Sequence, residues 1–163
     1  MITVSEGMWG KMANTIDRDT MLGAVGQELG LSPWFVVDQA RIDAFADVSE
    51  DRQFIHIDPV RATESVFGGT VAHGMLTLSM MSGMAYGALP VMEGQSASVN
   101  YGFEKVRFVA PVRSGARIRG RFVLADAQLR GRDNLMCRFD AMVEIEGEKR
   151  AALTAEWLVL YIY

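Results

Sequence analysis

Cysteine is almost missing from this 163-residue sequence, which holds only Cys137. A single cysteine cannot form an intramolecular disulfide, and it excludes a metal cluster built from cysteine ligands. This usage fits a reducing compartment best, so we expect a cytoplasmic protein.

Long apolar runs and an excess of basic residues are missing as well. No segment reaches the roughly 20 apolar residues that a membrane-spanning helix requires. The nearest one, 71–90, is interrupted by His73 and Thr77. Residues 1–19 mix charges with apolar side chains and do not resemble a signal peptide. The net charge is −4, which disfavours nucleic acid because phosphate binding usually needs a basic face. We therefore expect neither a membrane nor a nucleic-acid partner.

Apolar residues make up 50% of the chain and charged residues 22%, which is typical of a folded globular protein. The length points to one domain with a sizeable core. The pattern changes once, near Pro90. Helical spacing dominates before this residue, and alternation with a period of two dominates after it.

Helices are predicted in the first half. The first spans Gln39–Ser49, begins after Ser32 or Asp38, and has one face formed by Ile42, Phe45, Ala46 and Ser49. A short helix is predicted for 59–64, because Asp58 can cap it and Pro59 suits the first turn.

A long helix is predicted for 70–89, after Gly68 and Gly69 break the chain. Its residues are apolar on nearly all sides, with four methionines among them: Met75, Met80, Met81 and Met84. A helix that is apolar all round is usually buried.

Strands are predicted in the second half, where apolar residues alternate with charged ones. The expected segments are 96–109, 117–124, 137–145 and 153–161, with a turn at Gly131 and a hairpin turn at 146–148. One buried helix and a meander of long strands indicate an α+β protein in which an antiparallel sheet wraps around the helix, the hot-dog arrangement.

The sequence contains two histidines, His56 and His73. Asp51 precedes His56 by five residues, which on a continuous helix places the side chains roughly 140° apart. The two can therefore cooperate only if residues 52–55 are irregular. Spacing alone favours a structural interpretation, in which Asp51 is a solvated acid at a helix end and His56 is a partly buried histidine.

Gly74 follows His73 at the start of the predicted long helix and also allows two interpretations. The glycine can serve close packing alone. Alternatively, the first N–H groups of the helix, which lack intrahelical partners, can donate to a thioester oxygen, and glycine lets that ligand approach.

Residues 51–59, with the sequence Asp-Arg-Gln-Phe-Ile-His-Ile-Asp-Pro, resemble the hydratase motif of MaoC-like dehydratases and (R)-specific enoyl-CoA hydratases. The family motif has Asn and Pro where this chain has Gln53 and Phe54, and this variant is similar to the subgroup related to nodulation protein N. The resemblance continues through 67–79, 100–102, 105–108 and 111–112. It covers about 26 to 120, so it leaves an N-terminal extension, 1–25, on a single domain.

The resemblance implies a role for each matching residue. Asp51 and His56 match the catalytic pair that activates water, and Gly74 matches the glycine whose N–H contacts the thioester oxygen. The implied substrate-binding residues are Gln53, Ser82 and His73. Glu50 departs from the family, because a glycine commonly precedes the catalytic acid.

This chemistry converts a 2-enoyl thioester and water into an (R)-3-hydroxyacyl thioester, and it needs no metal or redox cofactor. The carrier is coenzyme A or acyl carrier protein, and the resemblance implies a homodimer. Two alternatives remain open: a hot-dog acyl-CoA thioesterase and a non-catalytic acyl-CoA-binding domain. The hydratase-type motif disfavours the first, and the presence of both Asp51 and His56 disfavours the second.

Overall fold

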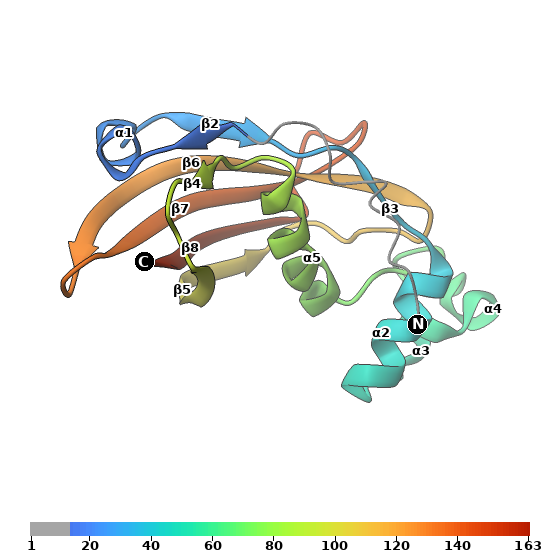
Figure 1. The fold of residues 1–163 in the computed structure, drawn as a ribbon. Coiled ribbons are helices and arrows are strands. Elements are labelled where there is room, and N and C mark those ends of the chain that lie inside the picture. The colour runs from blue at the N-terminus through green and yellow to red at the C-terminus, as the bar shows by residue number, and fades with distance from the viewer. Residues whose placement is uncertain (1–13) are drawn as a thin grey trace, which may run out of the picture.

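The computed structural model describes residues 14–163, which form an α+β fold (Figure 1). An antiparallel sheet curves over helix α5 (Gly74–Tyr86), and the helix lies against its inner face. The strands run in the order β2-β6-β7-β8-β5, and β3 also pairs with β6. Their bounds are β2 (Glu28–Leu31), β3 (Phe35–Val37), β5 (Ala97–Phe108), β6 (Ala116–Arg130), β7 (Asn134–Ile145) and β8 (Leu153–Ile162). The predicted hot-dog arrangement is confirmed.

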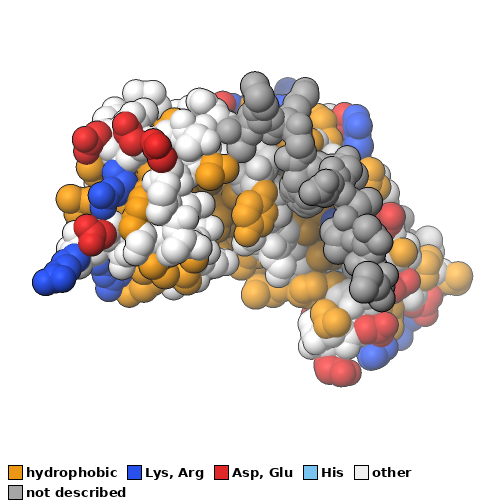
Figure 2. Space-filling view, in the orientation of Figure 1, with side chains coloured by type: hydrophobic (Ala, Val, Ile, Leu, Met, Phe, Trp, Pro, Cys, Tyr) orange, Lys and Arg blue, Asp and Glu red, His pale blue; other side chains and the backbone are white. Residues whose placement is uncertain are grey.

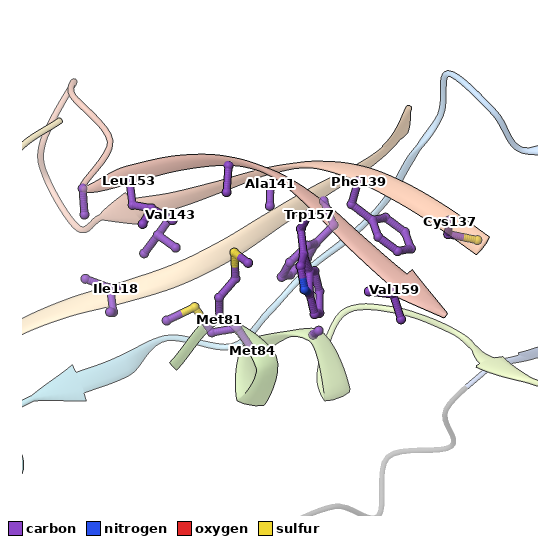
Figure 3. Close-up of a cluster of buried hydrophobic side chains, with 14 of the residues drawn as sticks. Met81, Met84, Ile118, Cys137, Phe139, Ala141, Val143, Leu153, Trp157 and Val159 are labelled. Carbon is purple, nitrogen blue, oxygen red and sulfur yellow. The ribbon is translucent and has the colours of Figure 1, made fainter. Parts of the chain in front are cut away.

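The core lies between α5 and the inner face of the sheet (Figure 3). Met81 and Met84 point from the helix toward the strands, where Phe139 and Trp157 are among the buried side chains. All five residues predicted for the inner face of the last strand are buried: Leu153, Ala155, Trp157, Val159 and Tyr161. The period-two pattern therefore identified the core side of this strand correctly.

The long helix is shorter than predicted, because α5 starts at Gly74 rather than at residue 70 and ends at Tyr86 rather than at 89. The residues before it hydrogen-bond elsewhere. The Val71 N–H donates to the Ile55 carbonyl, and the Ala72 N–H donates to the Val112 carbonyl. These bonds tie Val71 and Ala72 to other segments, so the helix starts only after them.

Three short helices lie between β3 and α5, namely α2 (Gln39–Ser49), α3 (Phe54–Ile57) and α4 (Pro59–Ala62). The predicted caps are confirmed: the Asp38 side chain accepts from the Arg41 N–H, and that of Asp58 accepts from the Arg61 N–H. The helix predicted for 59–64 ends two residues early. Part of the segment expected to be irregular, 52–55, is helical, since α3 starts at Phe54.

The first half also contains strands that helical spacing did not predict. Both β2 and β3 pair with β6, and β1 (Thr15–Ile16) pairs in parallel with β4 (Val91–Met92). These strands have two to four residues, too few for a period to be recognised. In the opposite direction, β6 extends six residues beyond the predicted 117–124, to Arg130.

Helix α1 (Arg18–Gly23) follows β1, and its Met21 is fully buried. Residues 1–13 lie outside the described residues. They include most of 1–19, which does not resemble a signal peptide, and half of the expected N-terminal extension, 1–25. The extension stays a prediction. Among residues 14–163, no helix has the length and apolar character needed to cross a membrane.

Candidate active site

The site begins where α2 ends. Glu50 caps this helix with φ +60°, a left-handed conformation that glycine adopts most easily. MaoC-like proteins commonly have glycine at this position, before the catalytic acid. The left-handed backbone conformation explains that preference. Glu50 occupies the conformation with a side chain that is 81% exposed and lies 3.7 Å from the Arg52 guanidinium. The turn directs the chain from α2 into the segment that carries Asp51.

Asp51, His56 and His73 converge. One carboxylate oxygen and one nitrogen of each imidazole lie within 4.8 Å of one another. The two histidines are buried, with 7% and 3% of their surface exposed, whereas Asp51 is exposed. The bend between α2 and α3 therefore brings together the two residues that a continuous helix would separate.

One nitrogen of the His56 ring is engaged in a hydrogen bond to the backbone. Its Nδ1 lies 2.6 Å from the Val71 carbonyl oxygen. A carbonyl only accepts, so Nδ1 carries the proton of the neutral ring and Nε2 keeps a free lone pair. Burial lowers the pKa of His56 below its ordinary value of 6.5, and His73 lowers it further, while the Val71 bond and Asp51 act in the opposite direction. The site thus favours a neutral imidazole that can accept a proton.

The His56 backbone is held by Gln39, a residue that no sequence pattern indicated. The Gln39 amide nitrogen donates to the His56 carbonyl over 2.6 Å, and its amide oxygen accepts from the Thr70 hydroxyl over 2.5 Å. Gln39 thereby ties α2 to α3 and to the segment before α5. Its place at the first position of α2 gave no sequence signal for this contact.

His73 lies against His56 as a stacked ring, with centroids 3.7 Å apart and planes inclined by 26°. Its Nε2 lies 2.8 Å from the backbone carbonyl oxygen of Asp51. The ring of Phe45 also contacts His73, with ring centroids 5.1 Å apart and planes inclined by 54°. His73 Nδ1 is buried, and among residues 14–163 it has no hydrogen-bond partner.

Gly74 is the first residue of α5, next to this cluster. Within the described chain no side chain caps this end of the helix, so the first N–H groups are available to a ligand. A Cβ on Gly74 would lie 2.9 Å from the Phe108 ring. Close packing by Phe108, the other interpretation of this glycine, therefore applies here. Phe108 belongs to 105–108, a segment that carries the family resemblance, but the sequence indicated no place for it beside the site.

Gln53 is the residue before α3, and its side chain makes no capping bond. Its backbone connects the two catalytic candidates, because its N–H points to the Asp51 carboxylate over 3.5 Å and its carbonyl accepts from the His56 N–H. The structure thus brings Gln53 beside Asp51.

Ser82 does not join the cluster. It lies eight residues beyond Gly74 on α5, about 12 Å along the helix axis. There it lines a cavity of about 160 Å³ together with Asn100 and Trp157, and neither Asp51 nor His56 lines that cavity. A larger cavity, about 940 Å³, extends along α1, β2, β3 and the residues after α5, also away from the cluster.

A carboxylate and two imidazoles are also donor types that transition metals use. Imidazole lone pairs lie in the ring planes, and two ligands of one ion must direct them to one point. The His56 and His73 rings are stacked with planes inclined by only 26°, so the two planes meet far from both rings. One ion therefore cannot accept an in-plane lone pair from each unless a ring rotates. This geometry does not fit a shared metal, and the absence of a metal stays a prediction.

Comparison with known proteins identifies the family. Residues 21–138 match the model of the MaoC like domain. The chain is 52% identical to nodulation protein N of Rhizobium leguminosarum bv. viciae over 83% of this chain and 85% of that protein. It is 36% identical to 3-hydroxyacyl-thioester dehydratase Z of Mycobacterium tuberculosis over 87% and 93%.

Solved structures agree with these sequence relatives. The (R)-hydratase from A. caviae involved in PHA biosynthesis superimposes with a TM-score of 0.65 and 27% identity, covering 83% of this chain and 94% of that one. The shared fold, the motif at residues 51–59 and the match over most of the chain lead to one conclusion: this chain belongs to the MaoC-like dehydratase and hydratase family.

Proposed function

We propose that the protein is a hydratase that interconverts a trans-2-enoyl thioester and an (R)-3-hydroxyacyl thioester. The observation that carries this proposal is the convergence of Asp51 and His56 beside the uncapped start of α5. Asp51 and His56 are an acid/base pair, and the start of α5 offers N–H donors to a thioester oxygen.

In the proposed reaction, the Asp51 carboxylate and His56 Nε2 hold a water molecule. Asp51 is exposed, so the pair has access to solvent water. His56 Nε2 takes one proton of the water as the water oxygen bonds to C3. This proton then passes to C2, so that the pair returns to its starting charge state. Negative charge passes through the thioester oxygen, where the Gly74 N–H stabilises it. Gln53, beside Asp51, and Ser82, along α5, are proposed as contacts to water and substrate.

The relatives support the reaction class. Their names include a 3-hydroxyacyl-thioester dehydratase and an (R)-specific enoyl-CoA hydratase, which describe one equilibrium from its two sides. We therefore propose enoyl-coenzyme A or enoyl-acyl carrier protein as the substrate. Acid/base chemistry suffices for adding water to a polarised alkene, so no metal or redox cofactor is proposed.

We further propose that the protein acts in the cytoplasm as a homodimer. Within residues 14–163, the outer edge of β5 has no neighbouring strand. This strand exposes Val99, Tyr101 and Phe108 by 39%, 49% and 52%, and hydrophobic side chains reach the surface on the face of Figure 2. Exposed strand edges and apolar patches are features of interfaces. Light scattering after size exclusion measures the mass, and a monomer at micromolar concentration contradicts the dimer.

The test of function is an assay on enoyl-coenzyme A esters from crotonyl to long chains. A hydratase bleaches the conjugated enoyl-thioester absorbance without releasing thiol, and chiral analysis should yield the (R) product. A thioesterase releases coenzyme A, which a thiol reagent detects. A binding domain does neither but raises the melting temperature with ligand. Thiol release without hydration contradicts the proposal, and the corresponding acyl carrier protein ester is assayed in parallel to cover the other carrier.

A further inference from the structure

The two histidines of the site are held by two different backbone carbonyls. His56 presents Nδ1 to the Val71 carbonyl, at 2.6 Å, and His73 presents Nε2 to the Asp51 carbonyl, at 2.8 Å. Each carbonyl can only accept, so each facing nitrogen must carry a proton. The neutral rings are therefore opposite tautomers, with the proton on Nδ1 in His56 and on Nε2 in His73.

The bond from His73 reaches the backbone of the catalytic candidate rather than its carboxylate. Asp51 follows the left-handed residue Glu50 and precedes α3, in a segment without helical hydrogen bonds. Asp51 bonds to its neighbours Ser49 and Gln53, and its backbone carbonyl also accepts a hydrogen bond from His73, which is 22 residues away. This bond therefore fixes the segment relative to α5.

The same ring also supports His56. The two imidazoles stack with their centroids 3.7 Å apart, and Phe45 packs on His73 with centroids 5.1 Å apart. His73 is 3% exposed, so its position is determined by packing. One side chain thus contacts both members of the pair, the backbone of Asp51 and the ring face of His56.

We propose that His73 is a positioning residue: its Nε2–H fixes the Asp51 backbone, and its ring face fixes the orientation of His56. His73 then takes no part in proton transfer and does not bind substrate through Nε2, which is already engaged. The catalytic consequence rests on the proposed hydratase function, whereas the tautomers can be tested without activity.

The tautomers can be read by long-range proton–nitrogen NMR on uniformly ¹⁵N-labelled protein without a histidine tag. The chain has two histidines, so the spectrum contains two imidazoles, and His73→Gln assigns them by removing one. We expect the Nδ1–H pattern for His56 and the Nε2–H pattern for His73. A His73 ring that is protonated on Nδ1 and not on Nε2 overturns the proposal whether or not the protein is a hydratase.

The catalytic consequence is tested with a matched pair of variants. A glutamine amide can reach the position of Nε2 and donate to the Asp51 carbonyl, whereas the shorter asparagine amide reaches only the position of Nδ1. Misplacing a catalytic group by about 1 Å can cost about 100-fold. We therefore expect His73→Asn to lower kcat about 10- to 100-fold with little change in KM. His73→Gln, which restores the bond but not the ring face, should recover part of kcat.

Circular dichroism and thermal melting of both variants separate positioning from folding, since a structural role alone lowers the melting temperature of both without this difference in kcat. Equal kcat values in folded His73→Asn and His73→Gln overturn the proposal. So does a loss confined to KM, which assigns His73 to substrate binding. If wild-type protein shows no hydration, the proposed function fails, and the NMR result still decides the tautomers.

Discussion

The sheet and the segment from Glu50 to Gly74 are built on different principles. The strands β6, β7 and β8 bury alternate apolar residues over long lengths, so many contacts specify the same register. The segment from Glu50 to Gly74 instead contains three of the buried polar side chains, His56, Thr70 and His73. It is held by single hydrogen bonds to backbone carbonyls and to Gln39. Many weak contacts make the sheet stable, and a few directed ones make the site specific.

The largest effect on stability is expected from the sheet. Phe139 is fully buried, and its ring lies 5.9 Å from that of Trp157. Phe139→Ala should lower the free energy of unfolding by about 3–5 kcal/mol, because it removes apolar contacts and leaves a cavity. Urea denaturation measures the change. A loss under about 1 kcal/mol would mean that the core is less closely packed than the comparison requires.

The largest effect on activity is expected from the site. Asp51→Asn and His56→Ala should each lower kcat/KM by about 100-fold or more, since each removes a partner in proton transfer. The losses should not add in the double variant, because the two residues act together. Circular dichroism checks that the fold persists. Near-full activity in either single variant, on the best substrate, would place the site elsewhere.

The hydrogen bonds around His56 should have a smaller effect. Gln39→Ala leaves the His56 carbonyl without its donor, which should cost about 1–3 kcal/mol of unfolding free energy and weaken turnover. Thr70→Val is the matched control, since it removes the bond to the Gln39 oxygen but leaves the bond to His56. Gln39→Ala should lower both the free energy of unfolding, measured by urea denaturation, and the hydration rate more than Thr70→Val does. The reverse order would mean that the bond from Gln39 does not support His56.

Acid should lower the free energy of unfolding through His56, which lies in the site segment rather than in the sheet. The pKa of His56 is lowered in the folded protein, chiefly by burial, from an ordinary value of 6.5. Below about pH 6.5 the unfolded chain binds a proton at His56 that the folded protein does not, so the free energy of unfolding decreases as the pH falls. Above about pH 6.5 both states are neutral at His56, and the full stability is retained. Urea denaturation between pH 5 and pH 8 should show the decrease, and His56→Gln should reduce it. An equal decrease in this variant would assign the effect to other groups.

The smallest effect, and a favourable one, is expected at Glu50. Glu50 has a left-handed backbone conformation, which glycine adopts without steric cost. Glu50→Gly should therefore raise the free energy of unfolding by about 0.5–1 kcal/mol. The lost contact to Arg52 subtracts little, because both side chains are exposed. Thermal melting measures the gain. A lower melting temperature would show that the Glu50–Arg52 contact stabilises the turn more than glycine does.

Several features of this protein were determined by the sequence alone. The alternation in β8 identified its buried face, and Asp58 with Pro59 predicted the start of α4. These features depend on neighbours within a few residues, which a period or a capping pattern captures. The motif at 51–59 indicated the family, and with it the candidate residues Asp51 and His56.

Other features were decided only by the tertiary structure. The start of α5 depends on bonds from 71 and 72 to Ile55 and Val112, and the strands β2 and β3 exist because β6 is there to pair with them. The contact of His73 with the Asp51 carbonyl joins residues 22 positions apart. A hydrogen bond between groups distant in the chain leaves no periodic trace in the sequence, because its geometry exists only after the elements that carry both groups have packed.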